Sequence, residues 1–458
     1  MKKQTKILFA SYECAPFFKM GGLGDVAGSL PKALKNLGVD VRVVIPYYTP
    51  VAKKYKLKKF KSVDLKIARR TIKLDIYKSY LTNSRVPIYF LSTTELSVAD
   101  PFEGEARFRF VLFAKLITEL PGILKWQPDI MHANDWQTGM VPLFERTVKS
   151  VYTIHNLAYF GRAEFKTLKR FGFKEDDFSS IDKRGSVNIM KEAILSSGAV
   201  TTVSPTYAKE ILTREYGYSL APSIKKRKRD LVGIINGLDY HVFNPATDKN
   251  IKFKYDINSL DKKIKNKLYL QKLSKLPEDK NIPIIGMVSR LAGQKGFDLL
   301  ESIIGDLMLQ DVQLVILGTG DPHFEQLFRK YNKKYKKKFR AHVTFSIELA
   351  SQIYAGADMF LMPSKYEPCG LGQLIAMKYG TIPIVRRTGG LADTVKGDTG
   401  FSFKAYNSAQ MLKTIHKALA VYASEKKWLK LVKNSMKKDF SWNSSAKKYL
   451  KMYRKLIK

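Results

Sequence analysis

Short apolar segments alternate with amphipathic segments along almost the whole chain, and this alternation most limits the folds open to it. The apolar segments have the length and near-continuous hydrophobicity of buried strands, and the segments between them place apolar residues at helical spacing. The strand candidates are residues 6–11, 41–48, 86–91, 129–134, 150–155, 199–204, 232–236, 282–289, 312–318, 342–346, 359–364 and 382–386. The pattern predicts an α/β fold with doubly wound parallel sheets.

The alternation is interrupted between residues 240 and 280 and starts again at Ile282. We therefore predict two similar α/β domains, covering residues 1–245 and 246–439, and an amphipathic last helix within residues 440–458 that has Ser441 as its N-cap. Two such domains that face one another form a central cleft. Ligands of open α/β sheets bind beyond the carboxyl ends of the strands.

The chain is strongly basic: of its 458 residues, 80 are Lys or Arg and 41 are Asp or Glu, so the net charge is +39. Clusters at Lys225–Arg229 and Lys330–Arg340 raise the alternative of a protein that binds nucleic acid or another polyanion. However, the basic residues are spread along the chain, without zinc-finger spacing or an RNA-binding signature. We favour a lysine-rich surface with a site for an anionic substrate, and we expect no nucleic-acid partner.

No segment approaches the roughly 18 apolar residues that a membrane helix needs. The first apolar run, residues 7–10, is too short for a signal peptide, and Glu13 follows it closely. We therefore expect a cytoplasmic protein without a membrane partner. Cys14 and Cys369 are the two cysteines, which excludes a disulfide framework and predicts two free thiols.

A glycine-rich segment, KMGGLGDVAG at residues 19–28, has the composition of a phosphate-binding loop. Gly22, Gly24 and Ala27 match the dinucleotide fingerprint of oxidoreductases, but YECAPFFKM separates them from the first strand, and the second strand lacks the required acidic end. A Walker loop needs its lysine after the last glycine, whereas Lys19 precedes the first. Two alternatives remain, a helix N-terminus that binds phosphate and a tight turn.

The second domain carries a pair of cations beyond its first strand. Arg290 and Lys295 follow the strand candidate 282–289, in a loop with Gly293 and Gly296. Cations at a strand end are candidates for pairing with phosphates, Arg through its planar fork and Lys as a point charge. The alternative for each is a surface side chain without a ligand.

Another loop of this domain, PSKYEPCGLGQL at residues 363–374, has a similar layout. Gly370 and Gly372 precede a helix and allow an anion to approach its N-terminus. Glu367 would repel phosphate, so we expect it to contact sugar hydroxyls or to stabilise positive charge, with helix capping as the alternative. No Asp-x-Asp pair that would hold a metal on a diphosphate is present, so we expect neither a metal nor a cofactor.

Two strand ends of the first domain carry His, Asp and amide residues beside aromatic residues. The polar group is His132, Asn134, Asp135, His155 and Asn156, and the aromatic group is Trp136, Tyr159 and Phe160. Such a grouping suits a sugar, through hydrogen bonds to hydroxyls and stacking on rings. A zinc site is the alternative, but HExxH is absent and neither cysteine is near in sequence.

In chain order, the sequence contains FKMGGLGDV, HANDWQTG, TIHNLAYFG, TTVSPTYAKEI, INGLDYHVFNP, VSRLAGQKGFDLL, IYAGADMFLMPSKYEPCGLGQL and YGTIPIVRRTGGLADTV. These motifs resemble those of the bacterial glycogen synthase and plant starch synthase family (glycosyltransferase family 5), over nearly the whole chain. The resemblance implies a GT-B fold, with two Rossmann-like domains facing a central cleft and the last helix packing back on the first domain.

The activity that the resemblance implies is retaining transfer of glucose from ADP-glucose or UDP-glucose to the non-reducing 4-hydroxyl of an α-1,4-glucan such as glycogen, without a metal. In the first domain, Lys19, Gly21 and Gly22 would lie by the donor diphosphate and the acceptor. Asp135 and His155 would line the glucose pocket, with His155 reaching the 6-hydroxyl region. Asn236 would also face the cleft.

In the second domain, the resemblance implies that Arg290 and Lys295 clamp the diphosphate and that Glu367 lies by the reacting sugar. The residues that would border the donor glucose or phosphate are Cys369, Gly370 and Leu371, followed by Gly372. The implied catalytic residues are His155, Arg290, Lys295 and Glu367.

The chain departs from the family pattern in three places. Where related retaining transferases often have a second Glu eight positions after the first, this chain has Ile375, and the regions 92–110 and 217–230 are shorter than usual in the family. The alternatives that we retain are a GT-B glycosyltransferase acting on a small sugar and a polyanion-binding protein.

Overall fold

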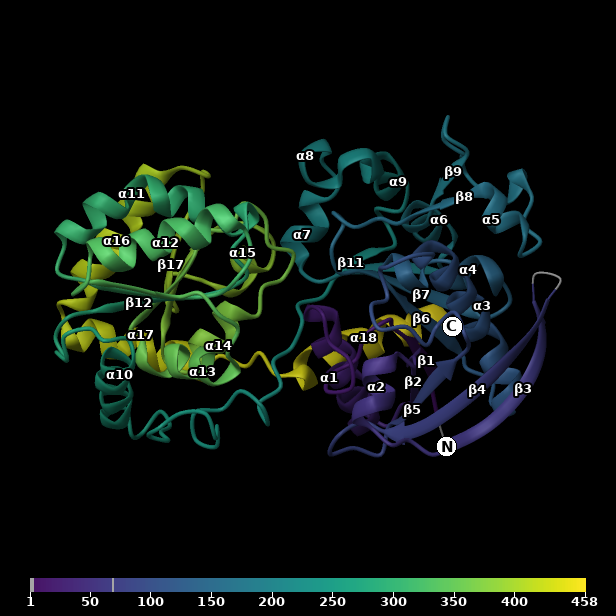
Figure 1. Cartoon of the computed structure of the whole chain (residues 1–458), viewed down its shortest axis with the longest axis horizontal. Helices are drawn as coiled ribbons and strands as arrows, with labels where there is room; N and C mark the ends of the chain where they lie inside the picture. The colour runs from purple at the N-terminus through teal and green to yellow at the C-terminus, as the bar shows by residue number, and fades with distance from the viewer. Residues whose placement is uncertain (1–3, 68–69) are drawn as a thin grey trace. The chain divides into compact units, whose positions relative to one another are not determined.

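The computed structural model describes residues 4–67 and 70–458. The chain divides into two compact units: unit 1 comprises Met1–Gly237 and Trp442–Lys458, and unit 2 comprises Leu238–Ser441. The division therefore follows Gly237, whereas the sequence analysis placed it after residue 245. Each unit has its own sheet with helices packed on it, and the predicted α/β class is confirmed (Figure 1).

Parallel strands form most of the unit 1 sheet, in the order β11-β10-β7-β6-β1-β2-β5. Their bounds are β1 (Lys6–Ala10), β2 (Asp40–Pro46), β5 (Pro87–Ser92), β6 (Ile130–Asn134), β7 (Lys149–Ile154), β10 (Ala199–Thr202) and β11 (Leu231–Gly233), and each overlaps a predicted strand. The chain leaves β1 toward β2 on one side and later returns to β6 on the other, so the strand order reverses between β1 and β6. Ligands of open α/β sheets bind at such a reversal.

An antiparallel hairpin of β3 (Lys59–Ile67) and β4 (Arg70–Tyr80) extends this sheet beyond β5, and the sequence analysis missed it (Figure 1). β4 pairs antiparallel with β5, so the predicted all-parallel sheet is mixed at this edge. β3 gives a weak signal because most of its side chains are polar and exposed, unlike the continuous apolar run of a buried strand.

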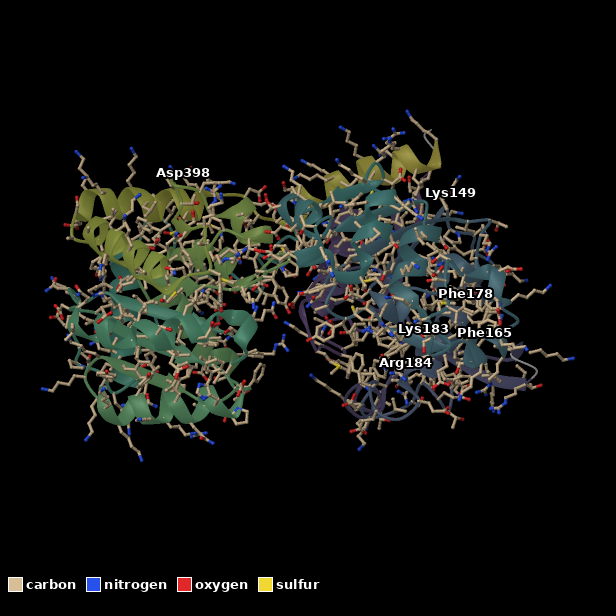
Figure 2. The ribbon with its side chains drawn as sticks, turned by 90° about the horizontal axis from the view of Figure 1, so that it is seen from above. Lys149, Phe165, Phe178, Lys183, Arg184 and Asp398 are labelled. Atoms are coloured by element: carbon tan, nitrogen blue, oxygen red, sulfur yellow. The ribbon has the colours of Figure 1, made fainter. Side chains whose placement is uncertain are left out.

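A small antiparallel sheet of β8 (Arg162–Glu164) and β9 (Ser186–Asn188) was also not predicted. Between its strands, Phe165 begins α5 (Phe165–Lys169) and contacts Phe178, with the ring centroids 6.2 Å apart (Figure 2). Lys183 and Arg184 form the turn that leads into β9. Strands of three residues are too short to leave a periodic signal in the sequence.

The last helix, α18 (Trp442–Ile457), packs in unit 1 against α1 (Gly22–Asn36). Ala446, Tyr449 and Tyr453 are fully buried in the same core cluster as β1 and β2. Unit 1 is therefore built from two separate stretches of the sequence.

The unit 2 sheet is parallel throughout, in the order β14-β13-β12-β15-β16-β17. Its strands are β12 (Ile284–Val288), β13 (Gln313–Leu317), β14 (Phe339–His342), β15 (Met359–Met362), β16 (Ile382–Arg386) and β17 (Phe401–Phe403). The strand order reverses between β12 and β15. The strand predicted at 342–346 is wrong in position, because β14 ends at His342 and Phe345 is 83% exposed in the loop that follows.

The unit 2 sheet is flanked by α10 (Asp261–Leu273), α11 (Phe297–Leu309), α12 (Pro322–Lys334), α13 (Ile347–Gly356), α14 (Gly372–Lys378), α15 (Gly389–Thr394), α16 (Ser408–Tyr422) and α17 (Glu425–Lys437). Over residues 4–67 and 70–458, no helix is both long enough and apolar enough to cross a membrane.

Candidate active site

Lys295 and Glu367 form an ion pair at the strand reversal of unit 2. Lys295 ends the short helix η4 (Gly293–Lys295) after β12, and Glu367 lies in the loop after β15. The Lys295 Nζ atom is 2.6 Å from Glu367 Oε2, and the Ser364 hydroxyl donates to the same oxygen at 3.2 Å. Both side chains are largely buried, 18% and 10% exposed, where charges attract strongly.

The loops that carry this pair are bonded to each other through their backbones. The Lys365 N–H donates to Gln294 O at 2.8 Å, and the Gln294 side-chain amide donates to Tyr366 O at 3.0 Å. Gly296 has a φ of +78° and lies so close to Pro363 that an added Cβ would be 2.3 Å from the Pro363 oxygen. A side chain at Gly296 would therefore force the two loops apart.

The glycine pair 389–390 supports the Glu367 loop from its other side. Gly389 has a φ of +42°, and an added Cβ would lie 2.0 Å from the backbone carbonyl oxygen of Glu367. The Gly390 N–H donates to Glu367 O at 3.2 Å. These glycines therefore fix the position of Glu367 by close backbone packing.

Arg290 follows β12, is exposed, and makes no side-chain hydrogen bond or ion pair with any residue that the structure describes. Its guanidinium is thus available to an anion from outside the protein. The second cation, Lys295, has a carboxylate partner in Glu367, and the predicted clamp of the diphosphate by the two cations stays a prediction.

The residues after Glu367 lead into α14. Cys369 is buried with 6% exposure, whereas Gly370, Leu371 and Gly372 are partly exposed. The Gln373 side-chain amide holds this turn by donating to Cys369 O at 3.1 Å and to Gly370 O at 3.0 Å. Their predicted contact with donor glucose or phosphate stays a prediction.

In unit 1, the buried carboxylate of Glu13 organises the glycine-rich loop. Its Oε2 atom accepts the backbone N–H of Met20 and, at 2.8 Å, that of Gly21. Burial raises the pKa of Glu13, and the N–H groups of Met20, Gly21 and Gly24 oppose this rise. From the sequence we expected the N–H groups of this loop to bind phosphate, and we did not predict that Glu13 accepts two of them. An acidic residue just after the first strand was the available signal.

Lys19 and Gly22 remain accessible on the outside of this loop. Lys19 makes an ion pair with Asp25, with Nζ 2.8 Å from Oδ1, and its side chain is 48% exposed. Gly22 is exposed and begins α1, while Gly21 is its N-cap. A flexible exposed lysine in a surface pair contributes little to stability and can exchange partners readily.

Asp135 and His155 lie together beyond β6 and β7. Asp135 Oδ1 accepts the His155 backbone N–H at 2.7 Å, and burial raises the pKa of Asp135 to about 7. Asp135 has a φ of +54°, a strained value for a residue with a side chain. The His155 Nε2 atom is 2.9 Å from Asn134 Oδ1, and burial lowers the pKa of His155 to about 3.

His132 does not belong to this group, which corrects the grouping made from the sequence. It is fully buried within β6, and burial lowers its pKa to about 3. Its Nδ1 atom is 2.6 Å from the Tyr453 hydroxyl of α18, and its Nε2 atom is 2.6 Å from the Thr153 hydroxyl. His132 thus ties α18 to the sheet.

Asn236 precedes the junction with unit 2 and is 6% exposed. Its buried Oδ1 atom accepts no hydrogen bond from the described part of the chain. Its predicted contact with the donor stays a prediction. Among the described residues, no group of three or more His, Cys, Asp or Glu is arranged to hold a metal ion.

Comparison with known proteins gives matches along nearly the whole chain. A family model described as the starch synthase catalytic domain matches residues 6–226, and one described as glycosyl transferases group 1 matches residues 271–436. The chain is 44% identical to a glycogen synthase of Thermotoga maritima and 41% identical to that of Thermosipho africanus, in each case over 99% of both chains.

Solved structures resemble the chain as well, among them the following two. The catalytic domain of starch synthase IV from Arabidopsis thaliana, bound to ADP and acarbose, matches with a TM-score of 0.90 and 30% identity over 99% of both chains. A sucrose-phosphate synthase from Thermosynechococcus elongatus matches with a TM-score of 0.64 and 18% identity over 99% of both chains, which is a likeness of fold.

Proposed function

The chain belongs to the glycogen synthase and starch synthase family of glycosyltransferases, and from this premise we propose that it transfers glucose from ADP-glucose to the non-reducing 4-hydroxyl of an α-1,4-glucan, with retention and without a metal. The family membership makes the chain a glycosyltransferase of GT-B fold that acts on a nucleotide sugar and a glucan. What we propose beyond the family membership is that the donor base is adenine, that the anomeric configuration is retained, and that the residues named below have the stated roles.

The Lys295–Glu367 pair at the unit 2 strand reversal carries the proposal. When the donor diphosphate leaves, the glucose becomes positively charged at its anomeric carbon and ring oxygen. The Glu367 carboxylate would stabilise that charge, and Lys295 with the unpaired Arg290 would stabilise the negative diphosphate. Preorganised charges of this kind contribute on the order of 3–4 kcal/mol per key donor, which supports metal-free departure.

In unit 1, Asp135 and His155 would contact the glucose, and the exposed Lys19 would contact the diphosphate. We infer that the acceptor 4-hydroxyl attacks the face from which the diphosphate departs. The anomeric carbon–oxygen bond to the diphosphate breaks, the bond to the acceptor oxygen forms, and the acceptor proton passes to the diphosphate. Ile375, at the position where related retaining transferases often have a second Glu, is apolar and buried, which favours this route over a covalent one.

We take ADP-glucose as the donor, because the starch synthase IV structure holds ADP, and UDP-glucose is the alternative. The exposed Phe345 ring after β14 would offer a flat surface to the base at the carboxyl edge of the sheet. The cytoplasmic location expected from the sequence stays a prediction.

Incubation of the purified chain with glycogen and either radiolabelled ADP-glucose or UDP-glucose, with EDTA present, tests the proposal. We expect label in the polymer from ADP-glucose, released by an amylase specific for α-1,4 linkages. Glu367→Gln should lower turnover far more than donor affinity. Salt-sensitive binding to nucleic acid without any sugar transfer would instead support a polyanion-binding protein.

A further inference from the structure

The Asn134 side chain has a fixed orientation at the end of β6. It is fully buried, and its Nδ2 group donates to Ala10 O of β1 at 2.9 Å, with His132 O at 3.4 Å. Rotating the amide by 180° would place Oδ1 against these two carbonyl oxygens and lose the donated bond. The amide therefore has one acceptable orientation, with Nδ2 toward the sheet and Oδ1 away from it.

This orientation decides which ring nitrogen of His155 carries the proton. Asn134 Oδ1 is 2.9 Å from His155 Nε2, and an amide oxygen can only accept, so Nε2 must donate. In the neutral ring the other nitrogen, Nδ1, then has a free lone pair, and it has no hydrogen-bond partner among residues 4–67 and 70–458. Asp135 accepts the His155 backbone N–H at 2.7 Å, so the ring is held at Nε2 and the backbone that carries it is held by Asp135.

We propose that Asn134 is a positioning residue that fixes His155 as its Nε2–H tautomer and thereby makes Nδ1 an acceptor for one hydroxyl of the donor sugar. The inference rests on the proposed function in one respect, that His155 faces the 6-hydroxyl region of the glucose. The lone pair of Nδ1 accepts a hydrogen bond from the 6-hydroxyl of glucose. A 6-deoxy sugar cannot donate this bond, and the carboxylate of a uronic acid is repelled by the lone pair. Asn134 thus determines sugar specificity without touching the sugar.

The first test is the tautomer itself, read by nitrogen NMR of the ligand-free full chain labelled with ¹⁵N-histidine. The chain has six histidines, and the His155 signals are assigned as those missing from His155→Gln. We expect Nε2 to carry the proton and Nδ1 to be unprotonated at neutral pH. A protonated Nδ1, or an average of both tautomers, would overturn the proposal whether or not the enzyme is active.

Two variants separate the hydrogen bond from the rest of the site. Asn134→Leu removes the acceptor and should let both His155 tautomers appear. Asn134→Asp is the rescue if the leucine variant does not fold. Burial favours the neutral acid, whose O–H can donate to Ala10 O while its second oxygen accepts from Nε2, so this variant should keep the wild-type tautomer. Asn266→Leu is the matched control: Asn266 is also a buried amide bonded to a backbone oxygen, Phe253 O at 2.6 Å, but lies in unit 2.

The second test is discrimination between nucleotide-linked glucose and 6-deoxyglucose, measured as the ratio of their kcat/KM values. We expect the ratio to fall about 10-fold or more in Asn134→Leu and to stay within about 2-fold in Asn134→Asp and Asn266→Leu. If the unmodified chain has the expected tautomer but Asn134→Leu leaves the kcat/KM ratio unchanged, the proposed role of Asn134 in sugar specificity is wrong. Absence of transfer from every donor would remove the proposed function, while the tautomer result would still decide the role of Asn134.

Discussion

At the scale of single residues, charged site residues of each unit pair with groups of the same unit. Lys295 pairs with Glu367, Lys19 pairs with Asp25, and Glu13 accepts N–H groups of the glycine-rich loop. Arg290 is the exception, without a partner in the described part of the chain. The partners of Lys295 and Glu13 keep these side chains in place before any substrate binds, which lowers the reorganisation needed during the reaction, whereas the exposed Lys19 can exchange its partner.

The two cations of unit 2 should both be needed for turnover. Lys295→Ala and Arg290→Ala should each lower kcat about 10²–10³-fold, because each removes a preorganised positive charge from the departing diphosphate. Steady-state kinetics with ADP-glucose and glycogen measure the kcat of each variant. Lys365→Ala, which removes an exposed lysine of the Glu367 loop, is the control and should stay near wild type. Near-normal turnover of both test variants would contradict the clamp.

Glu13→Gln should loosen the glycine-rich loop, because a neutral amide replaces a carboxylate that accepts two backbone N–H groups. Hydrogen bonds to charged groups are worth about 1.5–3 kcal/mol, so we expect the Met20 and Gly21 amides to exchange with solvent roughly 10- to 100-fold faster. Hydrogen-exchange mass spectrometry of this segment is the readout. The exposed Glu105→Gln is the control, and unchanged exchange in Glu13→Gln would show that the carboxylate does not hold the loop.

At the scale of elements, the buried parallel strands were predictable because a strand covered on both faces leaves a continuous apolar run. The predicted strand ends also placed Lys295 and Glu367 correctly in segments that follow strands. That these segments are adjacent and that the two side chains pair required the three-dimensional structure. The hairpin β3–β4 was missed because its polar, exposed residues resemble a loop. His132 was misplaced because the sequence does not show that Tyr453 of α18 covers the middle of β6, away from the strand end.

Residues of the two basic clusters, Lys225–Arg229 and Lys330–Arg340, donate hydrogen bonds to carbonyl groups at the C-terminal ends of helices. The Arg227 guanidinium donates to Ile194 O at 2.8 Å and to Ser197 O at 2.7 Å, at the end of α6 (Ile189–Ser196). Lys338 donates to Gln310 O at 2.6 Å after α11, and Arg340 donates to Ser274 O at 2.7 Å after α10. Cations at helix C-termini satisfy free carbonyls and the helix dipole, so part of the excess charge is structural.

The contact between β6 and α18 should make unit 1 sensitive to acid. In the folded protein burial lowers the pKa of His132 to about 3, whereas an unfolded histidine titrates near pH ~6.5. Between these values His132 is protonated in the unfolded chain and neutral in the folded chain, so its contribution to the free energy of unfolding falls as the pH falls from about 6.5 toward 3.

His132→Gln should therefore flatten the dependence of the unit 1 melting temperature on pH in this range, whatever its effect at neutral pH. Calorimetric scans at several pH values measure the slope. His416→Gln, at an exposed position of α16 in unit 2, is the control and should leave the slope as in wild type. An equal slope in His132→Gln would show that this histidine is already protonated in the folded protein.

At the scale of the whole molecule, each unit has its own hydrophobic core, and α18 completes the core of unit 1. Removing residues 442–458 exposes the surface that Tyr449, Leu450 and Tyr453 cover. Burying such side chains is worth about 1.5–3 kcal/mol each, and domains are stable by only about 5–15 kcal/mol. We therefore expect the truncated chain to lose the unit 1 melting transition and to keep that of unit 2.

Differential scanning calorimetry distinguishes the two transitions. Removal of residues 457–458 alone is the control, because the Ile457 side chain is exposed and this shorter deletion should leave both transitions in place. A unit 1 transition that survives the long deletion would mean that the remaining core is sufficient without α18.

The return of α18 to unit 1 also has a consequence for synthesis on the ribosome. The strands of unit 1 emerge first, but Tyr453, the partner of His132, is translated only after all of unit 2. The half of the protein made first therefore cannot finish folding until the half made second has left the exit tunnel. Until then, the nascent chain exposes the apolar surface that α18 later covers, and chaperones bind exposed apolar surface.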